Sequence, residues 1–363
     1  MFLALRDLRR GVRRFLLLGV VIALVAVLST VLSALATGLV TDGISGLRAL
    51  PFDRLALQEG AEATFSRSTL RGDALDRFEG VDGVEATPLG ASFVNAASTS
   101  GGPNLDLALF GVAPDSFLVT RDDARGALSG EPGLVLASEL EDQGVSVGDR
   151  YAISGSDLVL PVLGFTFAGT YGHAPIAFTS LDTWQQINFG GDPDERFSAV
   201  ALSGGSDDDL AGPASEAGVE LYTKSEAYAG SPGFTAETTT MTLIQGFLLV
   251  ISAVVIGAFL TVLTVQRTRQ IGLLKAMGAS TSYIARDALG QMAILVSVAT
   301  LCGVALGAVL VTIVGSGDVP VELNLTGTLG VAVSMIVVGL IGSAAALPRI
   351  VKVDPVIALG VEQ

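Results

Sequence analysis

Cysteine and histidine are almost absent from this chain. The 363 residues include one cysteine, Cys302, and one histidine, His173. A single cysteine excludes a disulfide within the chain, so its domains must be held by packing and sheet pairing. Structural zinc sites and Cys–His nucleophiles need clusters of these residues, and the sequence supports neither. We therefore assign no metal ligand.

The nucleotide-binding loop of P-loop ATPases is also missing. No Gly-x-x-x-x-Gly-Lys-Ser/Thr segment occurs, so the chain does not hydrolyse ATP by that route. We interpret the acids at 122–123 and 207–209 as solvated loop charges rather than hydrolytic carboxylates, and the second run lacks the spacing of a calcium loop. The net charge of −15 argues against a nucleic-acid partner. We assign no catalytic residue.

Charge is missing from four long segments, residues 15–40, 243–265, 288–314 and 325–347. Half of the chain is apolar and its mean hydropathy is +0.60. Since about 20 apolar residues span a bilayer, the segments predict four transmembrane helices. A cleaved signal peptide ending near residues 34–36 is the alternative for the first. Gly303 and Gly307 in the third form a small-x-x-x-small pair that permits close helix packing.

The charged residues predict the orientation in the membrane. Residues 1–14, 266–287 and 348–363 together hold 11 basic and 4 acidic residues, whereas the rest of the chain holds 10 basic and 32 acidic residues. Positive loops stay on the cytoplasmic side of a membrane. We expect a multi-pass protein of the plasma membrane with both termini cytoplasmic and the acidic part outside.

Residues 41–240 have a different character, with charges throughout and with glycine and proline between short apolar runs. Strand-like runs lie at 105–110, 134–137, 151–154, 159–166 and 199–202, and helical candidates at 69–78, 181–187 and 225–229. This pattern predicts an α+β domain of about 200 residues with one core, and room for two lobes. A short acidic outer loop is expected at 315–324.

Both ends of the chain predict short helices at the membrane surface. Residues 1–14 alternate apolar and arginine residues as an amphipathic helix does, although a basic tail without structure is the alternative. Near the C-terminus, Asp354 suits a helix N-cap and Pro355 suits the first helical position. A frayed tail is the alternative for segment 348–363.

The connection at 266–287 follows the second apolar run directly and is basic. Arg267, Arg269 and Lys275 stand among apolar residues, and Gly278 offers a helix stop. Such a helix below a membrane span suits a cytoplasmic partner. A solvated positive loop with no special role is the alternative.

The amino-acid sequence of this connection resembles that of the FtsX-like permease family, the membrane subunits of MacB-type ABC transporters. Residues 267–280 read Arg-x-Arg-x-Ile-Gly-x-Leu-Lys-Ala-x-Gly-Ala-Ser, and residues 354–359 read Asp-Pro-x-x-Ala-Leu, as the ends of such permeases often do. The resemblance extends to the order of spans and, more weakly, to outer-domain phrases at 110–117, 134–138 and 144–149.

The resemblance implies a coupling helix that contacts a separate ATPase. It assigns ATPase coupling to Arg267, Arg269, Ile271, Gly272, Leu274, Lys275, Gly278, Asp354 and Pro355. It further implies two copies of the ATPase subunit, a homodimer of the permease in the lipid bilayer, ATP bound only on the partner, and no intrinsic cofactor.

Within the family, the stretches 2–6, 169–184 and 230–237 look most like the haem-exporter (HrtB) and DevC-like branch. The side chains in and beside these stretches that suit haem iron are Tyr171, His173, Tyr228, Glu237 and Met241. An ordinary turn is the alternative for Tyr171 and His173, and a marker of the lipid–water boundary is the alternative for Glu237.

The sequence therefore predicts an α-helical membrane protein with four transmembrane helices plus an α+β extracytoplasmic domain inserted between the first and second. The expected function is a non-catalytic permease subunit that couples ATP hydrolysis on its partner to outward extrusion of a hydrophobic cargo, with haem as the best candidate. A signal relay that activates a cell-wall hydrolase, or an exporter of lipid, peptide or drug, is the alternative.

Overall fold

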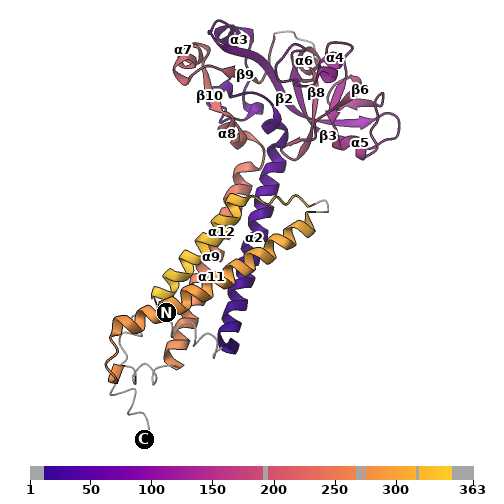
Figure 1. Ribbon diagram of the computed structural model, residues 1–363. Helices are drawn as coiled ribbons and strands as arrows, with labels where there is room; N and C mark the ends of the chain where they lie inside the picture. The colour runs from indigo at the N-terminus through magenta and orange to yellow at the C-terminus, as the bar shows by residue number, and fades with distance from the viewer. Residues whose placement is uncertain (1–11, 191–194, 267–272, 274, 316–318, 346–363) are drawn as a thin grey trace. The chain divides into compact units, whose positions relative to one another are not determined.

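A computed structural model describes residues 12–190, 195–266, 273, 275–315 and 319–345. They fall into two compact units, a helical unit of Met1–Leu39 and Glu237–Gln363 and a sheet unit of Val40–Ala236 (Figure 1). The predicted C-terminal segment 348–363 lies outside the described residues, as do residues 1–11 of the predicted amphipathic helix.

Four helices in the described part of the chain are long and apolar enough to cross a membrane. They are α2 (Val12–Ala49), α9 (Phe234–Gln266), α11 (Thr281–Val314) and α12 (Leu325–Ala345). Three of them are longer than the apolar runs that predicted them, because backbone hydrogen bonding continues a helix past its apolar part. At α11, for example, the Ser280 hydroxyl accepts a bond from the Tyr283 backbone N–H at 3.2 Å, so the helix begins before the run at 288.

Glycine contacts bring the helices of the helical unit together. A Cβ atom built on Gly303 of α11 would lie 2.4 Å from the Ala23 carbonyl oxygen of α2, and one built on Gly307 would lie 2.8 Å from Thr30 Cβ. The predicted small-x-x-x-small pair therefore packs α11 on α2 within the chain. On the other side of the bundle, Gly342 of α12 stands equally close to the Ala253 carbonyl of α9.

The sheet unit is built on one mixed sheet of ten strands in the order β10-β1-β9-β2-β3-β8-β4-β6-β5, with β7 paired to β8. The strands are β1 (Arg54–Gln58), β2 (Val84–Ser98), β3 (Leu105–Val112), β4 (Leu134–Ala137), β5 (Arg150–Ile153), β6 (Val159–Thr166), β7 (Thr170–Tyr171), β8 (Ala174–Ser180), β9 (Ala199–Gly204) and β10 (Val219–Thr223). The described residues thus confirm a mixed sheet domain together with four candidate membrane helices.

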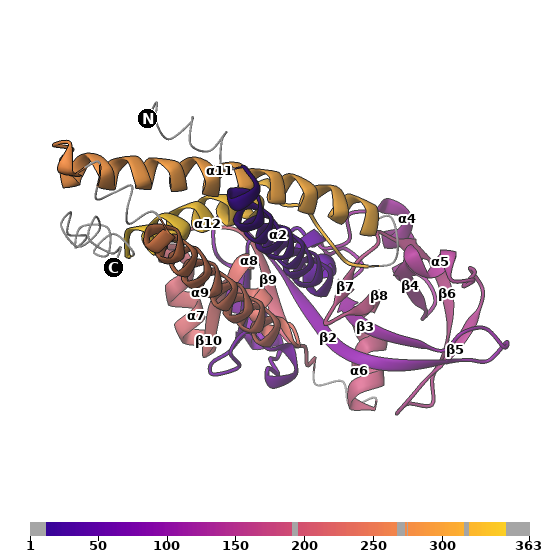
Figure 2. The same cartoon turned by 90° about the horizontal axis from the view of Figure 1, so that it is seen from below.

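Strand β2 is the longest of the sheet and pairs with strands in two parts of it. On one edge its residues 89–96 pair with β3. On the other edge residues 84–89 pair with β9, and residues 96–98 pair with β5. Because β5 returns to β2, the strands β2-β3-β8-β4-β6-β5 close a ring, whereas β9, β1 and β10 extend the sheet beyond it (Figure 2).

Short helices cover the sheet and separate its cores. They are η1 (Phe65–Arg67), α3 (Gly72–Glu79), α4 (Asp122–Leu128), α5 (Glu139–Asp142), α6 (Leu181–Phe189), α7 (Asp207–Ala217), α8 (Lys224–Ala227) and η2 (Tyr228–Gly230). Phe78 of α3 and Leu210 of α7 share a buried cluster with Leu202 of β9. The ring of strands has its own cluster, which includes Leu136 and Tyr151.

Trp184 of α6 rests on a glycine pair of the sheet. Gly90 of β2 and Gly111 of β3 are register partners, and a Cβ atom built on either would lie within 2.4 Å of Trp184. The indole is 3% exposed, and its Nε1 donates to the Ser92 hydroxyl at 2.9 Å. Two residues without side chains therefore create the seat that holds α6 against the sheet.

Gly111→Ala should destabilise the sheet unit by about 2 kcal/mol, because the added Cβ would lie 2.4 Å from Trp184 Cβ and displace the indole. Trp184 is the one tryptophan of the chain, so its fluorescence during thermal unfolding of the purified protein reports the midpoint. The control is Gly164→Ala in β6, where nothing lies within 4 Å of the new Cβ. Equal midpoints for the two variants would contradict the packing role.

Gly303→Val should lower the thermal unfolding midpoint of the detergent-purified protein, because its side chain would collide with the α2 backbone at Ala23. Gly290→Val on the same helix is the matched control, since a Cβ there meets no atom within 4 Å. If the two variants have the same unfolding midpoint, the packing of α2 on α11 does not depend on this close approach.

Candidate functional site

The tip of the β7–β8 hairpin carries two of the predicted cargo ligands. Tyr171 pairs with Ala174, which leaves Gly172 and His173 as a two-residue turn. Both have positive φ, at 57° and 63°. This combination is the type I′ turn that suits tight hairpins, and histidine adopts it more readily than branched residues do. The turn places Tyr171 and His173 in different surroundings.

Tyr171 belongs to an aromatic cluster in the interior of the sheet unit. Its ring stacks on Phe93 with a centroid distance of 5.7 Å and meets Phe65 and Phe110 edge-on. The hydroxyl donates to the Gly230 carbonyl at 3.1 Å, and burial raises the pKa of Tyr171. These contacts stabilise the neutral phenol, so binding of iron would require that bond to break and the hydroxyl to ionise.

His173 lies against the last part of α2. Its Nδ1 is 3.2 Å from a carboxylate oxygen of Asp42, and a Cβ built on Gly43 would lie 3.2 Å from the imidazole. Glu139 stands in the same acidic environment: burial and, second, the charge of Asp42 raise its pKa, while a bond from the Gly169 backbone lowers it. Among the described residues, no group of three or more His, Cys, Asp or Glu side chains could hold a metal ion.

Hydrogen bonds of the backbone and of two serine hydroxyls tie this hairpin to two other segments of the sheet unit. Gly172 N–H donates to the Gly43 carbonyl at 2.9 Å, and the Ser231 hydroxyl donates to the same oxygen at 3.0 Å. The Ser45 hydroxyl accepts from Thr170 N–H at 2.8 Å. The end of α2, the hairpin and the residues after η2 therefore meet in one polar junction, which we call the α2–hairpin junction.

The remaining predicted cargo ligands are divided between the two units. Tyr228 begins η2, packs half-buried against the main core, and has a pKa raised by burial, opposed by the charge of Arg48. The contact from Tyr171 reaches this element at Gly230. Glu237 and Met241 belong to the helical unit, where both are half-exposed on α9.

Part of the predicted coupling segment can be described. Leu273, Lys275 and Ala276 are helical, and Gly278 ends the turn with φ at 94°. Leu273 and Met277 are 51% and 68% exposed, and Lys275 is half-exposed, so apolar side chains are accessible here. The other predicted coupling residues lie outside the described residues: Arg267, Arg269, Ile271, Gly272, Leu274, Asp354 and Pro355.

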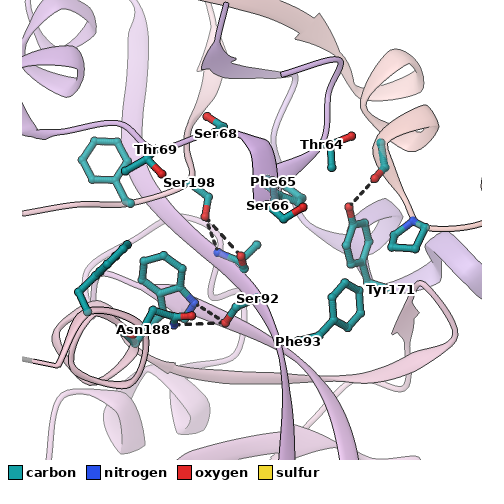
Figure 3. A pocket seen from close by; sticks show the side chains of 16 residues that line it. Thr64, Phe65, Ser66, Ser68, Thr69, Ser92, Phe93, Tyr171, Asn188 and Ser198 are labelled. Carbon is teal, nitrogen blue, oxygen red and sulfur yellow. Dashed lines mark hydrogen bonds between the residues drawn. The ribbon is translucent and has the colours of Figure 1, made fainter. Parts of the chain in front are cut away.

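A cavity in the sheet unit was not predicted from the sequence. It has a volume of about 290 Å³ and lies beside β2, between η1, α6 and the β7–β8 hairpin (Figure 3). Tyr171, Phe93 and Ser92 are among its walls. No local sequence pattern points to this cavity, because its walls come from six separate segments that only the folded sheet brings together.

One comparison with known proteins matches part of the helical unit. Residues 242–355 match the family model described as FtsX-like permease C-terminal. These residues include the last three apolar helices and the connection that contains Lys275 and Gly278.

The chain is also similar to curated relatives named putative hemin transport system permease protein HrtB. One from Staphylococcus epidermidis is 23% identical over 230 residues, which are 62% of this chain and 63% of that relative, or less than two thirds of its length. One from Staphylococcus haemolyticus is 22% identical over 363 residues, 99% of each chain.

Among solved structures, the extracellular domain of the noncanonic ABC-type transporter YknZ from Gram-positive bacteria covers 47% of this chain and 99% of its own, at 13% identity. The TM-score of this match is 0.34. By the family match, the chain therefore contains an FtsX-like permease domain at residues 242–355.

Proposed function

We propose that this chain is the non-catalytic membrane subunit of an ABC exporter of the MacB type. Two copies pair in the plasma membrane and bind two copies of a separate ATPase, which supplies the ATP hydrolysis. The observation that carries the proposal is the family match over residues 242–355. The charge distribution supports an outward-facing sheet unit, because residues 40–236 hold 29 acidic and 10 basic residues.

The coupling segment transmits the movement of the ATPase to the bundle. Leu273 and Met277 offer apolar contacts and Lys275 a charge, and Gly278 gives the turn its left-handed residue before Ser280 caps α11. A helix moves as one body, so a push at this turn displaces α11 along its length. The close contacts at Gly303 and Gly307 then transmit the movement to α2. Coupling requires these contacts to differ between nucleotide states.

The cargo in this proposal is a hydrophobic molecule extruded to the outside, and haem is the first candidate. Two relatives are named for hemin transport, which supports this choice. Haem iron accepts nitrogen, oxygen and sulfur donors, so His173, Tyr228, Glu237 and Met241 are the proposed ligands. The buried hydroxyl of Tyr171 is engaged with Gly230, so we assign its ring to packing.

Gly278→Val should uncouple the ATPase from transport, because a branched side chain is strained at φ of 94° and alters the turn. Gly278→Asn is the matched variant, since asparagine tolerates this conformation. The measurement is cargo-stimulated ATP hydrolysis and export by the permease co-purified with its ATPase. Full coupling in the valine variant would disprove a role for the turn, and failure of the ATPase to co-purify would disprove the proposed assembly.

Haem added to the purified permease should produce a saturable Soret absorbance. Glu237→Gln and Met241→Leu should each weaken the binding, because each removes a proposed donor at nearly constant volume. Tyr171→Phe should leave it unchanged, since the ring that packs on Phe93 remains. If no Soret band develops while lipids or drugs stimulate the ATPase, the exporter stands and haem is the wrong cargo.

A further inference from the structure

The cavity beside β2 has the composition of a binding pocket for an uncharged ligand. Its walls contain aromatic rings, hydroxyl groups and one amide, but no Asp, Glu, Lys or Arg, among the described residues. The surrounding unit carries 29 acidic and 10 basic residues, so this neutrality is local. The acidic field repels anions, and nothing in the walls would neutralise a charged group. A neutral ligand meets neither penalty.

One wall carries a hydroxyl that is free to donate. Ser92 Oγ accepts hydrogen bonds from Trp184 Nε1 at 2.9 Å and from Asn188 Nδ2 at 3.3 Å (Figure 3). A serine hydroxyl that accepts two bonds retains its own hydrogen. Because Ser92 lines the cavity, that hydrogen is available to an acceptor atom of a ligand.

The edge of β2 next to the cavity has an interval without a partner strand. The pairing of β2 with β9 ends at Leu89, and the pairing with β5 begins at Ala96. In between, the Ala91 backbone bonds with the Ser198 hydroxyl, and the Asn95 carbonyl accepts from Ser154 N–H at 2.9 Å.

Backbone direction alternates along a strand, so the N–H and C=O of Phe93 point to the same side as those of Ala91 and Asn95. No strand lies opposite Phe93 on that side in the part of the chain that the structure describes. The interval is one residue long, because Ser198 and Ser154 occupy the positions on either side. It therefore fits one acceptor and one donor of a small ligand rather than an added strand.

The ring of Phe93 supplies an apolar surface beside these backbone groups. It is 50% exposed although it stacks on Tyr171. Gly172 leaves room for it, since a Cβ there would lie 3.0 Å from the ring and 3.1 Å from Pro232. An accessible aromatic face next to hydrogen-bonding groups binds a ligand that has both an apolar face and polar substituents.

We propose that this pocket binds a neutral acetamido sugar. Its acetamido C=O would accept from Phe93 N–H, a neighbouring ring hydroxyl would donate to Phe93 C=O, and the methyl group and ring face would pack on the Phe93 side chain. Ring hydroxyls would bond to Ser92 and to the hydroxyls across the cavity. The volume of about 290 Å³ lies at the lower end of the range for small-molecule pockets and suits a single sugar ring. This inference does not depend on the transported cargo.

Binding can be tested by ligand-observed NMR on the full chain, purified in a detergent without a sugar headgroup. The probes are N-acetylglucosamine, glucose as the neutral sugar without an acetamido group, and N-acetyl-phenylalaninamide as the peptide-like amide. Ser66→Trp fills the cavity from an exposed position on its wall, and Ser215→Trp on α7 is the matched exposed control. Phe93→Ala is a second test at a side chain that is 50% exposed.

We expect N-acetylglucosamine to bind with a Kd of about 1 mM and glucose at least about fivefold more weakly. Ser66→Trp and Phe93→Ala should each weaken N-acetylglucosamine about tenfold, while Ser215→Trp should leave it unchanged. The proposal is overturned if binding does not saturate by about 20 mM, if glucose binds equally well, or if neither cavity variant changes the affinity. Tighter binding of N-acetyl-phenylalaninamide would also overturn it and assign the pocket to peptides.

Discussion

The pairing of β2 with three different strands is the constraint on which the sheet unit depends. One edge of this strand is taken by β3, and the other edge is divided between β9 and β5. The ring of strands and the extension through β1 and β10 are thereby fixed to one continuous backbone. The division also leaves the interval at Phe93. The same topology that joins the ring to the extension therefore leaves this part of the cavity wall without a partner strand.

The α2–hairpin junction ties this sheet to the segments at both ends of the sheet unit. Residues 42–45 of α2 bond to the β7–β8 hairpin. The second strand of that hairpin, β8, lies between β3 and β4 in the sheet. Tyr171 adds a bond to Gly230, just before α9 begins. The segments that enter and leave the sheet unit are thus joined by short polar contacts.

Particular residues show how far sequence reasoning reached. The apolar runs located the four long helices, and β4 and β6 begin and end at the predicted residues 134–137 and 159–166. Strand β2 escaped notice because Pro88 and Gly90 interrupt its pattern, and its pairing depends on segments up to 120 residues away. Tyr171 and His173 lie at a hairpin tip, the ordinary turn that was the alternative to a cargo site, and only the fold shows that one side chain is buried and the other reaches Asp42.

The sequence by itself determined the membrane character, the expected orientation and the resemblance in the basic connection, because hydropathy, charge and a local motif are properties of neighbouring residues. Tertiary structure decided which glycines pack, which tyrosine is buried and where an uncharged cavity forms. These features depend on long-range register: Gly90 lies beneath Trp184 only because β2 pairs with β3 and α6 returns across both. No local pattern encodes a contact whose partners are set by the closure of the sheet.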